Sequence, residues 1–147
     1  MTRKSSDRET ASVTESLTNR VNIANNVNAD LFISLHHNSA SAAASGVEVY
    51  YSSKAQDESF GGTYSDSKLS TSMNLAASIS ESITSNTGAI NRGAKDGNLF
   101  VIRNTIMPAV LIEFGFITNP EEAQKCADSN YQDLAVNAVV NAIGSEI

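Results

Sequence analysis

Apolar residues recur along two long segments at the spacing of an amphipathic helix. From 68 to 86 they lie three or four positions apart, and Gly88 follows where a helix C-terminal cap is expected. The segment 12–28 has the same spacing, and Ser12 with Glu15 fits a capping box at its start. We therefore predict a helix over each of these two segments.

Short apolar runs alternate with the predicted helices. Residues 31–36 and 109–113 have the length and apolar density of buried strands. Apolar and polar residues alternate over 46–51, as in a strand with one solvent-exposed face, and the run 99–102 predicts a further strand. The Ser-, Gly- and Asp-rich stretch 52–67 between them is predicted to be a loop.

The last part of the chain predicts two more helices and completes the fold class. Asn119 followed by Pro120 is typical of a helix start, and residues 131–143 carry apolar residues on one helical side. Helices and strands that alternate through short loops favour an α/β fold. We predict one domain over residues 1–147, with a central, mostly parallel twisted sheet and helices on both faces.

Charge and composition narrow the possible partners. The net charge is -6 and no stretch is rich in Lys and Arg, which disfavours binding to nucleic-acid phosphates. No apolar run approaches the roughly 20 residues of a membrane-spanning helix. The single cysteine, Cys126, excludes an internal disulfide, so redox chemistry does not indicate a compartment. We expect neither nucleic acid nor membrane as a partner.

Two ionisable residues stand at the ends of predicted buried strands. His36 ends the run 31–36 and Glu113 ends the run 109–113. In open α/β sheets, ligands bind beyond the carboxyl ends of the strands. Taken singly, such a His is more often a hydrogen-bonded structural residue, and such a Glu is more often a cap or an ion-pair partner. Together they supply the parts of a metallohydrolase, namely an imidazole for Zn²⁺ and a carboxylate that accepts a proton from water.

A count of metal ligands leaves this interpretation incomplete. Catalytic zinc takes three protein ligands and keeps a fourth position open. The only histidines are His36 and His37, and consecutive residues of a strand point to opposite faces, so we expect His37 either to support a metal ligand without binding the metal or to be structural. Unless carboxylates fill the gap, the chain does not complete a zinc site from its own residues.

Two long sequence blocks resemble one known family. The first comprises 20–25 (RVNIAN), 29–38 (ADLFISLHHN) and 46–48 (GVE). The second comprises 91–95 (NRGAK) and 99–121 (LFVIRNTIMPAVLIEFGFITNPE). Both resemble the zinc-dependent N-acetylmuramoyl-L-alanine amidases, a family that includes sporulation and cell-division autolysins and phage endolysins. The blocks occur in the family's order and, with their connecting helices, cover essentially the whole chain.

The resemblance implies a function and assigns roles to residues. It implies one Zn²⁺ ion and hydrolysis of the amide between N-acetylmuramic acid and L-alanine in peptidoglycan, by a monomer acting at the extracellular cell wall. His36 matches a histidine ligand of the family and Glu113 matches its catalytic glutamate. Arg92 and Lys95, which we expect in a Gly-bearing loop before a strand, are candidates for contacts to anionic groups of the stem peptide, although solvated loop charges would look the same. Asn38 is a candidate to orient the zinc ligand, or simply the cap of a turn.

The start of the chain departs from the family pattern. The family's opening strand with a Gly-His motif and its next, glutamate-bearing helix have no counterpart here. Thr2-Arg3 and Asp7 resemble the segment after the family's second strand, so we expect a domain that is incomplete at its N-terminus. Glu9 or Glu15 could substitute as a ligand only after refolding. The alternative function is a truncated or degenerate domain without catalysis that acts as a weak cell-wall-binding or interaction module. A generic α/β protein that binds a small ligand would require both blocks to be coincidental.

Overall fold

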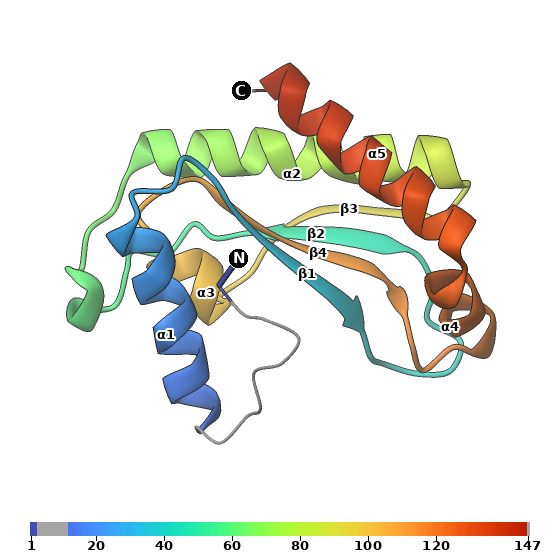
Figure 1. Ribbon diagram of the computed structural model, residues 1–147, viewed down its shortest axis with the longest axis horizontal. Helices are drawn as coiled ribbons and strands as arrows, with labels where there is room; N and C mark the ends of the chain where they lie inside the picture. Colours follow the sequence, from blue (N-terminus) through green and yellow to red (C-terminus); the bar gives the residue numbers. More distant parts are fainter. Residues whose placement is uncertain (3–11, 147) are drawn as a thin grey trace.

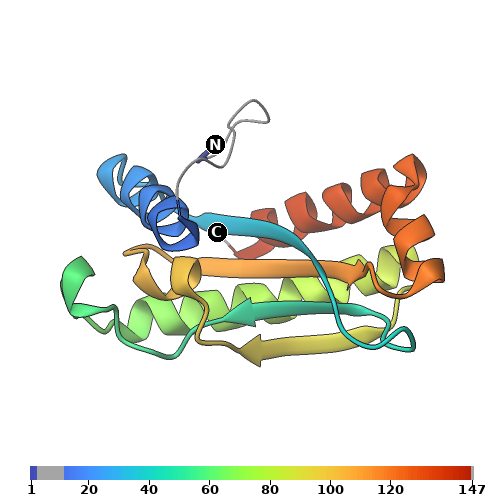
Figure 2. The same ribbon diagram turned by 90° about the horizontal axis from the view of Figure 1, so that it is seen from below.

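A twisted sheet lies between two layers of helices in the computed structural model, which describes residues 1–2 and 12–146 (Figures 1 and 2). Glu9, which could substitute as a ligand only after refolding, and Arg3 and Asp7, which resemble the family, fall outside the described residues. Within the described part, four strands are arranged in the order β1-β4-β2-β3. Their bounds are Phe32–Asn38 for β1, Val47–Tyr51 for β2, Asn91–Asp96 for β3 and Ala109–Phe116 for β4.

Strand directions make the sheet mixed. The pairs β1–β4 and β2–β3 are parallel, whereas β2 runs antiparallel to β4. The α/β prediction is therefore confirmed, with parallel pairing in two of three strand contacts. Because β2 is reversed, its first residues lie beside the carboxyl end of β4.

Each face of the sheet has its own apolar core and its own helices. Helices α2 (Asp66–Thr87) and α5 (Ser129–Glu146) pack on one face, around the buried side chains of β2 and β4. Helices α1 (Val13–Asn26) and α3 (Phe100–Asn104) pack on the other face. Successive side chains of a strand point to opposite faces, so each one packs against either the α2/α5 layer or the α1/α3 layer.

Local sequence signals fix the helix ends. The Ser12 hydroxyl accepts a hydrogen bond from the Glu15 amide, as its capping box predicts. Gly88 adopts a left-handed conformation and its amide donates to Thr84 at the end of α2. Asn119 caps α4 (Pro120–Ala127). None of the helices in the described ranges is both long and apolar enough to cross a bilayer.

Two sequence predictions are wrong, and they concern adjacent segments. The run 99–102 is not a strand: Leu99 is the N-cap of α3 and residues 100–102 lie within that helix. A four-residue apolar run fits a buried helix turn equally well. The Gly-bearing segment with Arg92 and Lys95 is not a loop but the border strand β3. Its polar side chains hide the strand pattern, since one side of a border strand faces solvent.

Candidate active site

The two strand-end residues identified from the sequence are neighbours in the sheet. His36 and Glu113 are directly paired in the parallel register of β1 and β4. Side chains of directly paired residues project from the same face of a sheet. The imidazole and the carboxyl group therefore share the α1/α3 face, at the carboxyl ends of both strands.

A third ionisable residue, which the sequence analysis missed, extends this row onto β2. Glu48 is directly paired with Glu113 in the antiparallel register. Val47 and Val49 on either side of it belong to the core of the α2/α5 face, so Glu48 projects to the face of His36. Two local signals pointed to it: an acidic residue between two valines, and its place in the segment 46–48 that resembles the family.

The Glu48 carboxylate is buried and fully occupied by donors. Its side chain is 3% exposed, and Oε2 accepts from Arg92 Nε at 2.8 Å and from Lys95 Nζ. Oε1 accepts from Tyr50 Oη at 2.7 Å and from Asn38 Nδ2 at 2.6 Å. Burial alone would raise its pKa, but the hydrogen bonds from Arg92, Lys95 and Tyr50 outweigh burial and lower the pKa to about 2. Glu48 is therefore ionised at neutral pH.

Glu113 has the opposite environment. Its Oε2 atom is buried and has no hydrogen-bond partner among the described residues. Burial, followed by the negative charge of Glu48, raises the pKa of Glu113 to about 7. Two neighbouring carboxyl groups whose pKa values are driven apart are a common basis for acid and base roles. Glu113 is the one that can change its protonation state near neutral pH.

His36 lies where a ligand could reach it. Its Nε2 atom is 2.9 Å from the Ser34 hydroxyl. Burial, together with the positive charges of Arg20 and His37, lowers the pKa of His36, so the imidazole is neutral at pH 7. It lines an open hollow of about 810 Å³ between β1 and α1, whereas Glu113 lies one strand further in.

These residues fit only part of a zinc site. A neutral imidazole is a suitable ligand, so His36 fits one position. The described residues contain no group of three His, Cys, Asp or Glu side chains that could hold a metal ion. His37 points to the other face, where its ring centroid lies 6.2 Å from that of Phe114. The part of the chain that is described therefore does not complete the ligand set.

The candidate substrate contacts gather around Glu48. Arg92 and Lys95 both pair with its carboxylate, and their side chains remain 38% and 34% exposed. The Arg92 guanidinium also lies 5.0 Å from the centroid of the Phe116 ring. Asn38 donates to Glu48 and accepts from the Ser39 amide, and within the described ranges it makes no hydrogen bond to His36.

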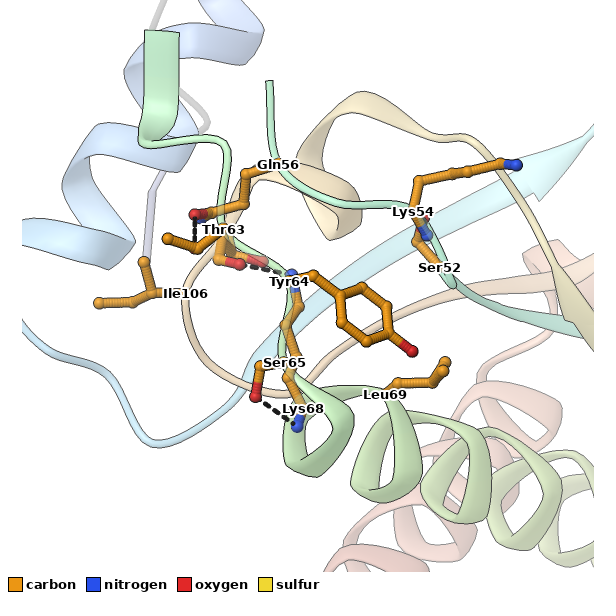
Figure 3. A pocket seen from close by; sticks show the side chains of 10 residues that line it. Ser52, Lys54, Gln56, Thr63, Tyr64, Ser65, Lys68, Leu69 and Ile106 are labelled. Carbon is orange, nitrogen blue, oxygen red and sulfur yellow. Dashed lines mark hydrogen bonds between the residues drawn. The ribbon is translucent and has the colours of Figure 1, made fainter. Parts of the chain in front are cut away.

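A second hollow lies away from this row, at the start of α2 (Figure 3). Its space of about 20 Å³ holds no more than a water molecule. The Lys68 ammonium at its wall donates to the carbonyl oxygens of Arg103 and Thr105, and burial lowers the pKa of Lys68 to about 8. This lysine ties α2 to the end of α3, and the hollow is too small for a sugar or a peptide.

Comparison with known proteins shows the family to which the chain belongs. The family model described as Amidase_3, N-acetylmuramoyl-L-alanine amidase, matches residues 1–145. The chain belongs to this family of peptidoglycan amidases.

Relatives and solved structures support the assignment. The chain is 39% identical over 129 residues to the uncharacterized protein YqiI of Bacillus subtilis, covering 88% of this chain and 57% of YqiI. It is 36% identical over 125 residues to the amidase LytC of the same organism, covering 84% of this chain and 23% of LytC.

The crystal structure of an N-acetylmuramoyl-L-alanine amidase from Clostridium difficile 630 superposes with a TM-score of 0.73 at 34% identity, covering 88% of this chain and 63% of that one. The catalytic domain of CwlV from Paenibacillus polymyxa gives a TM-score of 0.72 at 33% identity, covering 88% and 64%. The chain thus spans less than two thirds of each of these proteins.

Proposed function

We propose that this chain carries the catalytic glutamate and one zinc ligand of a peptidoglycan amidase. The reaction is hydrolysis of the amide that joins the lactyl group of N-acetylmuramic acid to L-alanine. The observation that carries this proposal is the direct pairing of His36 with Glu113 on one face of the sheet. Family membership and the amidases among the similar structures support the choice of substrate.

Glu113 serves as the proton-transfer group. A carboxyl group with a pKa of about 7 can accept and donate a proton at neutral pH with little free-energy cost. Glu113 takes a proton from the attacking water as the water oxygen bonds to the scissile carbonyl carbon. It then gives that proton to the nitrogen of L-alanine as the carbon–nitrogen bond breaks. Such proton transfer typically contributes about 10²–10⁴ in rate.

His36 serves as a ligand for Zn²⁺, and the remaining ligands come from outside the residues that the structure describes. A bound zinc ion would supply an acidified water and polarise the scissile carbonyl. The hydrogen bond between Ser34 and His36 holds the ring in one orientation on β1. This imidazole stays neutral at pH 7, as metal ligation requires.

The rim beside Glu113 binds the stem peptide. Arg92 and Lys95 contact an anionic group of the peptide with the N–H groups that Glu48 does not use. Asn38 supports this rim through Glu48. The protein acts as a monomer at the extracellular cell wall. The cell wall amidases among its relatives support this location.

Zinc content and product release test the proposal. The zinc-treated protein is expected to hold about one zinc ion and to release new N-terminal alanine from purified peptidoglycan. Glu113→Gln should lose at least about 10²-fold in rate while its zinc content is unchanged. Glu121→Gln, which removes an exposed carboxylate at the start of α4, is the matched control and should retain full activity.

Two outcomes would refute the assignment. Retained activity in Glu113→Gln would exclude Glu113 as the proton-transfer group. Absence of both zinc and alanine release would favour the second candidate function, a degenerate domain that binds the cell wall without catalysis. The observation that favours this second candidate is that the described residues do not complete a set of zinc ligands.

A further inference from the structure

Glu48 uses all of its acceptor capacity inside the protein. Each carboxylate oxygen receives two donors, from Arg92 and Lys95 on Oε2 and from Tyr50 and Asn38 on Oε1. A carboxylate in this state has no oxygen left for a metal ion, for water or for substrate. Although it lies beside Glu113, it is not a second proton-transfer group.

The donors around Glu48 come from three strands. Asn38 ends β1, Tyr50 lies on β2, and Arg92 and Lys95 lie on β3. β1 and β3 are the two borders of the sheet and do not touch. Glu48 therefore connects the strand that carries His36 with the strand that carries both cations.

The charges around Glu48 do not balance. Two cations share one carboxylate, which leaves one net positive charge on a chain whose net charge is -6. The carboxylate is buried, whereas Arg92 and Lys95 are about a third exposed at the rim. Lys95 makes no further hydrogen bond to any described residue, so its other N–H groups are available to a ligand.

We propose that Glu48 is the positioning residue of the site, which holds Arg92 and Lys95 of β3 in place so that they bind a carboxylate of the stem peptide. This inference rests on the proposed peptidoglycan substrate. Guanidinium and ammonium groups recognise carboxylates through charge-assisted hydrogen bonds, which depend on orientation. Long cationic side chains that are already held in place lose less conformational entropy when they bind.

Binding of a synthetic peptide tests this role without requiring turnover. The probe begins with L-alanine and has a free carboxylate on its second residue, and the same peptide with that carboxyl group amidated is the ligand control. Wild-type protein should bind the acidic peptide at least about fivefold more tightly than the amidated one. Glu48→Gln should bind the acidic peptide about tenfold more weakly, because the cations lose their anchor.

Two more variants separate positioning from a general loss of structure. Glu48→Asp keeps the charge but shortens the side chain, so its affinity should lie between those of wild type and Glu48→Gln. Asp57→Asn removes an ion pair that lies away from the site, in which Asp57 Oδ1 is 2.6 Å from Arg103 Nη2. This matched control should bind both peptides as wild type does. Circular dichroism verifies that each variant is folded at the temperature of the titration.

The outcomes distinguish the positioning role from the proposed function. If Glu48→Gln binds the acidic peptide as tightly as wild type, or more tightly, Glu48 only offsets positive charge and the positioning role is excluded. An equal loss of affinity in Asp57→Asn would also exclude it. If wild type binds neither peptide, the substrate contact and the positioning role fail together, while the alanine-release assay still decides the proposed activity.

Discussion

Glu48 and Glu113 are directly opposed on β2 and β4, yet their pKa values lie on opposite sides of the ordinary value of a glutamate. Hydrogen bonds from Arg92, Lys95 and Tyr50 outweigh burial and hold the pKa of Glu48 at about 2, whereas burial and the charge of Glu48 raise the pKa of Glu113 to about 7. The ionised member of the pair thus helps to keep its neighbour protonated. This difference leads to opposite effects of pH on stability.

For Glu113, stability should fall as pH rises. The folded protein holds the proton up to a pH of about 7, whereas the unfolded chain loses it near 4.5, so the folded state binds more protons within this window. The free energy of unfolding of metal-free wild type should therefore decrease between pH 4.5 and 7 relative to that of Glu113→Gln, by about 2 kcal/mol after solvent screening. Urea unfolding at several pH values in a chelating buffer measures this. A pH-independent difference between the two proteins would contradict the raised pKa.

For Glu48, the dependence has the opposite sign. Its lowered pKa stabilises the folded protein above the unfolded value of 4.5, and this stabilisation disappears as pH falls towards 2. Glu48→Gln should lose about 3 kcal/mol at pH 7, because Arg92 and Lys95 lose the carboxylate that accepts their hydrogen bonds. The loss should shrink steadily below pH 4.5. Glu81→Gln, on the exposed side of α2, should change stability by less than about 0.5 kcal/mol.

Gly46 should not tolerate a side chain. Its φ of +108° is rarely adopted by other residues, and an added Cβ would lie 2.5 Å from the Ile90 carbonyl oxygen. Gly46→Ala should therefore cost about 2–4 kcal/mol in thermal or urea unfolding. Gly144 in α5 has no atom within 4 Å of such a Cβ. Gly144→Ala should stabilise the protein by about 0.5–1 kcal/mol, and equal losses for both variants would contradict the steric argument.

The two adjacent histidines should differ in metal binding. His36 shares the face of Glu113, whereas His37 lies on the opposite face near Phe114. His36→Ala should reduce bound zinc at least about tenfold, and His37→Ala should leave zinc content within about twofold of wild type. Plasma emission spectrometry after dialysis measures both. Similar zinc contents in the two variants would show that β1 does not present His36 as a ligand.

Much of the fold follows from local signals in the sequence. The helices begin and end within a few residues of their predicted bounds, because Ser12, Gly88 and Asn119 cap them as their residue types predict. The sequence assigns the two strand-end residues to one site, and the register places His36 beside Glu113. Ligands of open α/β sheets bind beyond the carboxyl ends of the strands, so this assignment needs no knowledge of the other strands.

The part of the site that was not predicted from the sequence depends on long-range geometry. Glu48 reaches Glu113 only because β2 runs antiparallel to β4, and no local pattern encodes that direction. Its partners Arg92 and Lys95 lie on β3, whose polar sequence resembles a loop. The apolar run 99–102 was equally ambiguous, and tertiary packing decided it in favour of the helix α3.

The position of β1 determines from which direction additional groups can reach the imidazole. Among the described strands, β1 hydrogen-bonds to β4 alone, so its outer backbone groups are available for another strand. A strand that pairs there would run about 4.8 Å from the backbone of His36 and would point alternate side chains to the same face. Protein segments that join this border, from whichever polypeptide they come, would therefore add their functional groups directly beside His36.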